Sequence, residues 1–398
     1  MVKHTILFDD IRREHLLPLT YTRPVAEIRV GILTIKEKWE RHLNTKCYSL
    51  TFDYLADKFP LPSENGTCLL INGGVFPSEK LVLEVNQLQV NQALVSNSTV
   101  IAVLLSKVPE IGYLPTIDRI ENKLNSEEEI VQIFHPWDIF RMNGLALERD
   151  FELITKGRKS QPIPSSNKVF NPERVFVEEG ATVECAILNA STGPIYIGKD
   201  AEVMEGSMIR GSFALCEHST LKLGAKIYGP TTIGPQSKVG GEVNNSVIFG
   251  FTNKAHDGFL GNSVIGEWCN IGADSNNSNL KNNYAEVKLW CYAKRSFVNT
   301  GLQFCGLIMG DHSKCGINTM FNTGTVVGVS ANIFGDGFPR NFIPSFSWGG
   351  AQGFSVYKIE KALETARLVM ERRGIALDEI EVAILTKIFE LSAEFRKH

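Results

Sequence analysis

A repeat with a period of six residues dominates the middle of the chain. An aliphatic side chain occupies every sixth position from residue 197 to residue 239, at Ile197, Val203, Ile209, Leu215, Leu221, Ile227, Ile233 and Val239. An α-helix advances about 100° per residue, so this spacing would scatter the side chains around the helix. Glycine and proline recur between these positions and would interrupt any long strand. The pattern therefore predicts stacked turns of very short strands, which is a parallel β-helix of hexapeptide repeats.

The same six-residue phase returns outside this stretch. It reappears at Phe259, Ile265 and Ile271, then at Met309, Cys315, Phe321, Val327 and Ile333, after a weaker start at Val169, Val175, Ala181 and Ile187. The phase slips near residues 241–258 and 273–300, where we expect loops to leave the β-helix. Loops of this kind often carry functional residues. A turn-rich β-sandwich is the alternative fold, although irregular strand lengths rarely give an unbroken sixfold pattern.

The first part of the chain has an α/β pattern. The apolar runs HTILF, CLLIN and STVIAVLL are typical of buried strands. Thr34 and Glu37 have the spacing of a capping box before an amphipathic helix. Strands that alternate with helices favour an open, mostly parallel sheet covered on both faces.

These patterns divide the chain into four segments. Residues 1–155 form the α/β domain, and the basic, proline-rich residues 156–172 form a linker. The β-helix occupies residues 173–345, and two amphipathic helices follow in residues 346–398. We expect these helices to cap the open end of the β-helix, because an uncapped end would expose an edge and an apolar interior.

Composition excludes several classes of partner. The 41 basic and 44 acidic residues give a net charge of −3, so bulk charge predicts no nucleic-acid or membrane-surface partner. The sequence shows no secretory leader pattern and no apolar run long enough to span a bilayer, which predicts a cytoplasmic protein. The 8 cysteines form no CxxC pair, and we expect them to be reduced and buried.

Candidate chemistry gathers around the first slip of the repeat. His256 lies there, followed by Asn270 and a run of amides that ends at Asn279. Residues about one turn apart in a β-helix stack on each other, so these side chains can converge on one pocket. A neutral imidazole beside amides suits deprotonation of an amine or hydroxyl nucleophile. The alternative is structural, with His256 closing a corner and the asparagines forming a ladder.

The stretch AHDGFLGNSVIGEWCNIGADSNNSN resembles the acetyltransferase motif of the GlmU-like family. Members of this family are bifunctional enzymes that acetylate glucosamine-1-phosphate with acetyl-CoA and then attach a nucleotide. The order of domains is similar too, so the resemblance implies a nucleotidyltransferase-like α/β domain, a left-handed β-helix, and a homotrimer whose acyl-CoA sites are shared between subunits.

The resemblance also implies roles for individual residues. His256 takes the place of the catalytic base, and Asn270 and Asn279 take the places of sugar-contacting asparagines. Ala273 falls at the acetyl end of the coenzyme. The nearby cations that could bind the sugar phosphate are Lys281 and Lys288.

The first domain resembles the nucleotidyltransferase half of this family in a divergent form. The usual glycine-rich loop is replaced by IRREHLLPLTYTRPVAEIRVG. Its arginines Arg13, Arg23 and Arg29 could neutralise the phosphates of a nucleoside triphosphate, and Asp9 or Asp10 could hold Mg²⁺. The alternative is that these charges form an ion-pair network in a domain without activity.

The sequence therefore favours a transferase of nucleotide-sugar biosynthesis, of the UDP-N-acetylglucosamine type. Its β-helix would acetylate an amino-sugar 1-phosphate, and its first domain would transfer a nucleotidyl group from a nucleoside triphosphate. Two alternatives stay open. In one, only the first domain is catalytic and the β-helix is a trimerisation scaffold; in the other, the chain is a non-catalytic protein that binds a nucleotide sugar.

Overall fold

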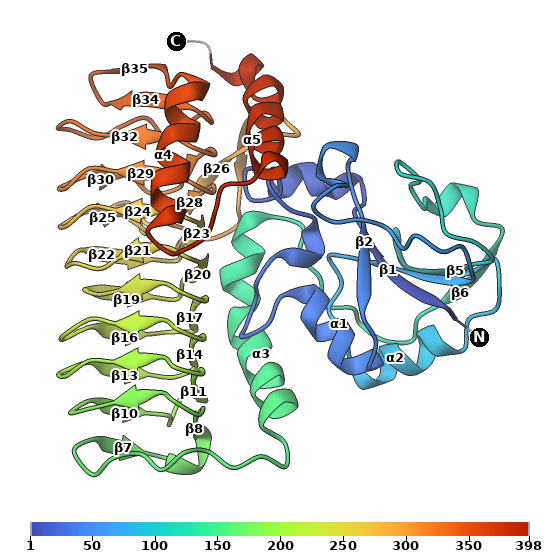
Figure 1. Cartoon of the computed structure of the whole chain (residues 1–398), viewed down its shortest axis with the longest axis horizontal. Helices are drawn as coiled ribbons and strands as arrows, with labels where there is room; N and C mark the ends of the chain where they lie inside the picture. Colours follow the sequence, from blue (N-terminus) through green and yellow to red (C-terminus); the bar gives the residue numbers. More distant parts are fainter. Residues whose placement is uncertain (1, 397–398) are drawn as a thin grey trace.

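The computed structural model describes residues 2–396 and shows a β-helix beside an α/β domain (Figure 1). The β-helix forms a column of short strands at the left of the view, and the α/β sheet lies at the right. Helix α3 (Pro136–Thr155) runs along the column between these two parts. The predicted order of an α/β domain, a parallel β-helix and carboxyl-terminal helices is thereby confirmed.

The sheet of the α/β domain is mixed. Its strands are β1 (His4–Phe8), β2 (Cys47–Leu50), β3 (Cys68–Asn72), β4 (Gln92–Ser96), β5 (Thr99–Leu105) and β6 (Asn122–Asn125). Their order in the sheet is β2-β1-β3-β5-β4-β6, and β5 runs antiparallel to both of its neighbours. The prediction of a mostly parallel sheet is confirmed for the other five strands, and β5 is the exception because the tight turn at residues 97–98 joins β4 and β5 as a hairpin.

The helices of this domain begin where the sequence places their caps. Helix α1 (Ile35–Leu43) follows Thr34, whose hydroxyl accepts a hydrogen bond from the Glu37 backbone N–H while the Glu37 carboxylate accepts one from the Thr34 N–H. The predicted capping box is confirmed. Helix α2 spans Glu79–Asn86, and the short 3₁₀ helices are η1 (Ile11–Leu16), η2 (Val25–Glu27), η3 (Asp53–Leu55), η4 (Ile117–Arg119), η5 (Pro172–Arg174) and η6 (Ala393–Phe395).

The β-helix has three parallel sheets, one on each side. The first sheet contains β7 (Lys168–Phe170), β10 (Ile187–Asn189), β13 (Met208–Arg210), β16 (Lys226–Tyr228), β19 (Glu242–Asn244) and β22 (Phe259–Gly261), with the separate pair β25 (Asn276–Asn277) and β30 (Met320–Phe321). The second contains β8 (Val175–Val177), β11 (Ile195–Ile197), β14 (Phe213–Leu215), β17 (Thr231–Ile233), β20 (Val247–Gly250), β23 (Val264–Glu267), β28 (Leu307–Met309), β31 (Thr325–Val327) and β33 (Phe342–Ile343). The third contains β9 (Thr182–Val183), β12 (Glu202–Val203), β15 (Thr220–Leu221), β18 (Lys238–Val239), β21 (Asn253–Lys254), β24 (Asn270–Ile271), β29 (Lys314–Cys315), β32 (Asn332–Ile333) and β34 (Ser347–Gly350), and ends with the antiparallel β35 (Gly353–Val356).

The repeat residues from 197 to 239 all point into the β-helix, and none is more than 2% exposed. The phase is wrong by one residue in two other places. Ile187 is 40% exposed while Leu188 is buried, and Leu260 rather than Phe259 pairs with the inward Val243. Corners of unequal length separate the strands, so a strict count of six drifts from the inward positions.

Only one of the two slips in the repeat releases a long loop. Residues 241–258 stay within the β-helix, because β19, β20 and β21 continue its three sheets with shorter corners. The expected loop at this slip is therefore absent. The second slip carries an inserted antiparallel hairpin, β26 (Lys288–Cys291) and β27 (Ser296–Asn299), as predicted.

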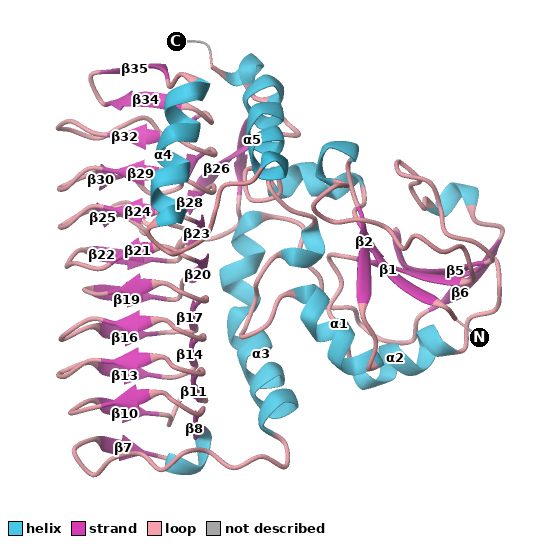
Figure 2. Ribbon diagram, in the orientation of Figure 1, coloured by secondary structure: helices cyan, strands magenta, loops and turns pink. Residues whose placement is uncertain are grey.

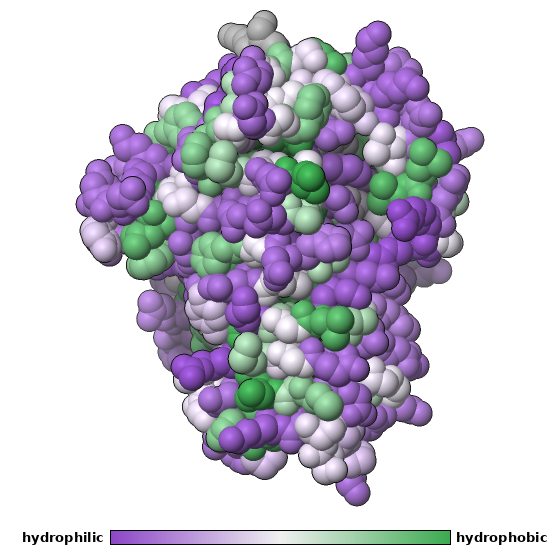
Figure 3. Space-filling view, turned by 90° about the vertical axis from the view of Figure 1, so that its left-hand side faces the viewer, coloured by the Kyte–Doolittle hydropathy of each residue, from purple (hydrophilic) through white to green (hydrophobic). Residues whose placement is uncertain are grey.

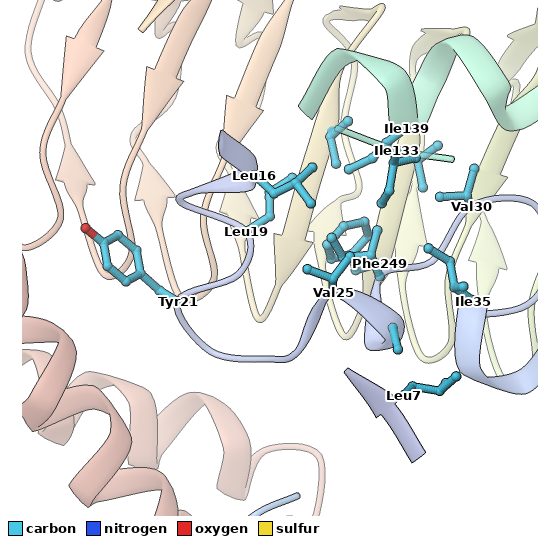
Figure 4. Packing of buried hydrophobic residues seen from close by; sticks show 14 of the residues in the cluster. Leu7, Leu16, Leu19, Tyr21, Val25, Val30, Ile35, Ile133, Ile139 and Phe249 are labelled. Atoms are coloured by element: carbon cyan, nitrogen blue, oxygen red, sulfur yellow. The ribbon is translucent and has the colours of Figure 1, made fainter. Parts of the chain in front are cut away.

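The α/β domain and the β-helix share a hydrophobic core. One cluster extends from Leu7 and Val25 of the α/β domain to Phe249 of the second β-helix sheet (Figure 4). Asn143 of α3 joins the two parts, because its Oδ1 accepts hydrogen bonds from the Gly31 N–H at 2.7 Å and from the Thr232 hydroxyl at 3.1 Å. Contacts of this kind fix one orientation between the two parts.

The carboxyl-terminal helices α4 (Ile359–Glu371) and α5 (Glu379–Leu391) do not close the end of the β-helix. They lie along the side of its last turns, and the β34–β35 hairpin occupies the end (Figure 2). Ala366, Met370 and Ile388 belong to the core cluster that also contains the α/β domain. The prediction that these helices cap the end is therefore wrong. Their apolar faces instead pack on the side of the β-helix and on the α/β domain.

Two expectations from composition can be compared with the structure. All 8 cysteines are free, and each is buried except Cys185, which is exposed. Between residues 2 and 396 no helix combines the length and the apolar character that crossing a membrane requires.

Candidate active site

A pocket of about 770 Å³ lies between the third β-helix sheet and helix α4. Its walls include three of the residues singled out from the sequence, His256, Asn270 and Ala273. The remaining lining residues are Lys238, Phe251, Asn253, Ala255, Cys269, Ile271, Gly272, Lys314, Ile317, Thr365, Val369, Arg372 and Arg373. The fold therefore brings the proposed base, one of the amides and the proposed acetyl site to the same pocket.

His256 lies in the corner between β21 and β22. Its side chain is exposed, while its backbone carbonyl accepts a hydrogen bond from Lys254 Nζ at 2.9 Å. The same Nζ donates to the Gly240 carbonyl at 2.9 Å, and Lys254 occupies an inward position and is only 1% exposed. Burial lowers the pKa of Lys254 to about 8. A buried lysine thus fixes the corner that carries the histidine.

Gly258 closes the same corner by close packing. Its φ is +121°, and a Cβ atom there would lie 2.2 Å from the Ser275 carbonyl oxygen. Only glycine permits this approach of the backbone to the next turn.

Asn270 belongs to a row of outward side chains on the third sheet. It pairs with Asn253 on one side and Lys314 on the other, and neighbouring strands are about 4.8 Å apart. The Asn270 side chain is exposed and has no hydrogen-bond partner within residues 2–396. Its amide is therefore available to a ligand. Ala273 follows in the next corner, where its carbonyl accepts a hydrogen bond from the Asn318 N–H at 2.8 Å.

The other predicted ligands of the sugar lie away from this pocket. The amide nitrogen of Asn279 donates to Asn262 Oδ1 at 2.8 Å. Lys281 Nζ donates to the Glu286 carbonyl at 2.8 Å, and Lys288 is exposed on the β26–β27 hairpin. The sequence prediction thus does not locate the positive charge of the pocket, which comes from Lys238, Lys314, Arg372 and Arg373.

Sequence signals for these four cations exist but are indirect. Lys314 immediately precedes the inward Cys315, so it must point outward beside Asn270. Lys238 precedes the inward Val239 in the same way. Arg372 and Arg373 follow directly after an amphipathic helix, and only the packing of that helix brings them to the pocket.

The α/β domain has two adjoining hollows where β1 ends. One is about 510 Å³ and the other about 260 Å³, and Asp10 lines both. Arg12 lines the smaller hollow together with Asn72. The strand after β1 is β2 on one side, whereas the strands after β3 lie on the other side, so the chain leaves β1 and β3 in opposite directions at this edge. Such a switch point is the usual place for a ligand in an open α/β sheet.

None of the arginines singled out from the sequence lines these hollows. Arg13 is buried, with its Nε 3.2 Å from Asp9 Oδ2. Arg23 is buried between Asp311 and Glu267 of the β-helix. Arg29 donates from Nη1 to the carbonyl of the nearby residue 32. Arg29 Nη1 also lies 3.8 Å from Glu37 Oε2, so the geometry favours the ion-pair alternative for all three arginines. Arg12 is then the arginine on the smaller hollow.

The predicted Mg²⁺ ligands are already engaged by protein groups. Asp9 Oδ1 accepts from the Val25 N–H at 2.8 Å, and Oδ2 accepts from the Thr51 hydroxyl at 2.6 Å. Burial raises the pKa of Asp9. Asp10 is paired with Arg12. Both carboxylates thus have protein partners, and the described residues contain no cluster of three or more His, Cys, Asp or Glu side chains that could hold a metal ion.

Parts of the chain are similar to known proteins. Residues 5–159 match the sugar nucleotidyl transferase family. A bifunctional sugar-1-phosphate nucleotidylyltransferase/acetyltransferase of Sulfurisphaera tokodaii is 29% identical over 206 residues, which cover 51% of this chain and 44% of that protein. The bifunctional protein GlmU of Methanocaldococcus jannaschii is 28% identical over 274 residues, covering 67% of this chain and 56% of its own.

Among solved structures, UDP-N-acetylglucosamine acyltransferase from Campylobacter jejuni matches 59% of this chain and 83% of its own, with a TM-score of 0.32 and 12% identity. The chain spans about half the length of the curated relatives it matches. The sugar nucleotidyl transferase match at residues 5–159 and the similarity to these bifunctional relatives support a place for this chain in a divergent branch of the GlmU-like family.

Proposed function

We propose that this protein is a transferase of nucleotide-sugar biosynthesis with two sites. The β-helix would transfer the acetyl group of acetyl-CoA to the amine of an amino-sugar 1-phosphate, and the α/β domain would transfer a nucleotidyl group to the sugar phosphate. The observation that carries the proposal is the single pocket lined by His256, Asn270 and Ala273. The names of the relatives, which are bifunctional, support both activities.

In the β-helix, acetyl transfer needs a base and a holder for the sugar. The amine nitrogen attacks the thioester carbonyl, so that a C–N bond forms and the C–S bond breaks. His256 would accept the proton of the attacking nitrogen, and the thiolate of CoA would leave and take up a proton. The free amide of Asn270 would hold a sugar hydroxyl, and the corner fixed by Lys254 would hold the histidine in place.

In the α/β domain, the nucleoside triphosphate would bind across the two hollows at the end of β1. It would enter as its Mg²⁺ complex, so the metal is part of the substrate and not a resident ion. Arg12 is the cation at this edge and would contact a phosphate group. Asn72, whose amide nitrogen donates to Asp10 Oδ2 at 3.0 Å, would help to orient that edge.

We further propose that the protein is cytoplasmic and forms a homotrimer. We also propose that its β-helix is left-handed and that the chain divides into an α/β domain, a linker, the β-helix and a helical segment at residues 1–155, 156–172, 173–345 and 346–398. The first β-helix sheet supports an assembly through its outer face. That face exposes the apolar side chains Ile187, Met208 and Tyr228. Figure 3 views the molecule from the left-hand side of Figure 1 and shows hydrophobic residues scattered among hydrophilic ones.

The decisive experiment measures free CoA when acetyl-CoA and glucosamine-1-phosphate are supplied together. We expect thiol release above the level seen with either substrate alone. A parallel assay measures pyrophosphate from UTP or dTTP with Mg²⁺ and N-acetylglucosamine-1-phosphate. Pyrophosphate without CoA release would favour the scaffold alternative, and neither product would favour the non-catalytic binding protein.

A further inference from the structure

The pocket beside α4 carries positive charge without a negative partner. Its lining includes Lys238, Lys314, Arg372 and Arg373, and it contains no aspartate or glutamate. Within residues 2–396 none of these four side chains takes part in an ion pair. Positively charged side chains without acidic partners in a concave site raise the local concentration of anions.

The cations come from both walls of the pocket. Lys238, Asn253, Asn270 and Lys314 follow one another on adjacent strands, so the two lysines stand roughly 14 Å apart at about 4.8 Å per strand. Arg373 Nη2 donates to Asn253 Oδ1 at 3.0 Å. This hydrogen bond holds the end of α4 over the space between the lysines.

Two of these cations are held in surroundings that disfavour a positive charge. Lys314 Nζ donates to the His312 carbonyl at 2.8 Å, and burial lowers the pKa of Lys314 to about 8. Burial and the neighbouring Arg372 lower the pKa of Arg373. An anion between these side chains would stabilise their charged forms, which burial disfavours. The Lys314 ammonium group still has N–H donors that can bind such an anion.

We propose that the end of α4 and the row of the third sheet form a subsite for a phosphate ester, with Arg372 and Arg373 as ligands. The inference rests on the proposed function and assigns the phosphate-binding role to α4 instead of Lys281 and Lys288. The phosphate can come from the amino-sugar 1-phosphate or from CoA. Both present the same chemistry, a phosphate oxygen that accepts hydrogen bonds from guanidinium groups.

The test compares the double variant Arg372→Gln/Arg373→Gln with the control Arg367→Gln. Arg367 lies on the same helix, is exposed and does not line the pocket. Isothermal titration calorimetry of the full chain would use acetyl-CoA, glucosamine-1-phosphate and unphosphorylated glucosamine. We expect at least tenfold weaker binding of one phosphorylated probe in the double variant, and wild-type binding in the control.

The probe that loses affinity identifies the source of the phosphate. Unchanged binding of both phosphorylated probes in the double variant overturns the proposal, as does failure of the wild type to bind either one. The proposed function fails in a different way. If the wild type binds a phosphorylated probe through these arginines but releases no CoA with both substrates present, the subsite stands and the acetyltransferase assignment is wrong.

Discussion

Arg23 of the α/β domain and Asp311 of the β-helix form a buried ion pair across 288 residues of sequence. Arg23 also lies 3.0 Å from Glu267, and the Thr22 hydroxyl donates to Asp311 at 2.7 Å. Glu267 and Asp311 stand a few residues before β24 and β29, two strands that line the candidate pocket. These ion pairs and this hydrogen bond thus join the α/β domain to the β-helix next to the proposed acetyltransferase site.

Breaking this pair should destabilise the whole chain. Arg23→Ala leaves the buried Asp311 carboxylate and the partly exposed Glu267 carboxylate without their cation, and we expect a loss of about 3 kcal/mol in the free energy of unfolding by urea. The matched control is Arg295→Ala, which breaks an exposed pair with Glu394 and should cost less than about 1 kcal/mol. If Arg23→Ala instead weakens binding of UTP with Mg²⁺ at unchanged stability, Arg23 is a phosphate ligand after all.

Removal of the proposed base should affect only one activity. His256→Ala should lower acetyl transfer to glucosamine-1-phosphate by about 10²-fold, because no other imidazole lines the pocket within the described residues. Pyrophosphate release by the α/β domain should be unchanged. His218→Ala is the control, since His218 is another exposed corner histidine of the β-helix. Wild-type acetyl transfer in His256→Ala would make this histidine structural.

The buried Lys254 should make stability depend on pH. Its folded pKa of about 8 lies below the ordinary 10.5, so between these values the unfolded chain binds one more proton than the folded chain. The free energy of unfolding contributed by this group therefore rises with pH across that window, by about 3 kcal/mol in total. The difference in unfolding free energy between wild type and Lys254→Met, measured from pH 7 to pH 10, should increase with pH. A constant difference would show that the lysine is not desolvated.

Ligand binding should have the opposite pH dependence. Lys314 is charged below its pKa of about 8 and neutral above it, so affinity for the phosphorylated ligand should fall as pH rises through 8, by about tenfold. Lys314→Gln should bind more weakly at pH 7 and show a flatter profile. Calorimetric titrations at pH 7 and pH 9 check both expectations, and parallel profiles for the two proteins would remove Lys314 from the site.

The sixfold repeat predicted the fold well because its period follows from backbone geometry. Every inward residue from Ile197 to Val239 is buried as expected. The errors at Ile187 and Phe259 arise at corners, where the number of residues per side varies and no side chain reports it. The antiparallel direction of β5 was not predicted for a similar reason, since a short turn decides it.

The candidate site was predictable only where strand register creates it. His256, Asn270 and Ala273 meet because successive turns stack. Arg372 and Arg373 reach the same pocket through the packing of α4, which depends on apolar contacts with distant segments. The prediction that Arg23 binds a phosphate did not foresee its ion pairs with Glu267 and Asp311. The sequence of the loop that carries Arg23 does not show which residues of another domain will pack against it.

The inserted β26–β27 hairpin separates β23 and β24 from β28 and β29 in the sequence, yet these strands pair in register, with Ile265 opposite Met309 and Ile271 opposite Cys315. The β-helix therefore accommodates inserted residues at a corner without a change in the register of its strands. The hairpin reaches the α/β domain, where Cys291 Sγ lies 3.7 Å from His15 Nδ1. Evolution can lengthen, shorten or replace such a corner and so change what the neighbouring domain touches, while the histidine and amide rows keep their spacing.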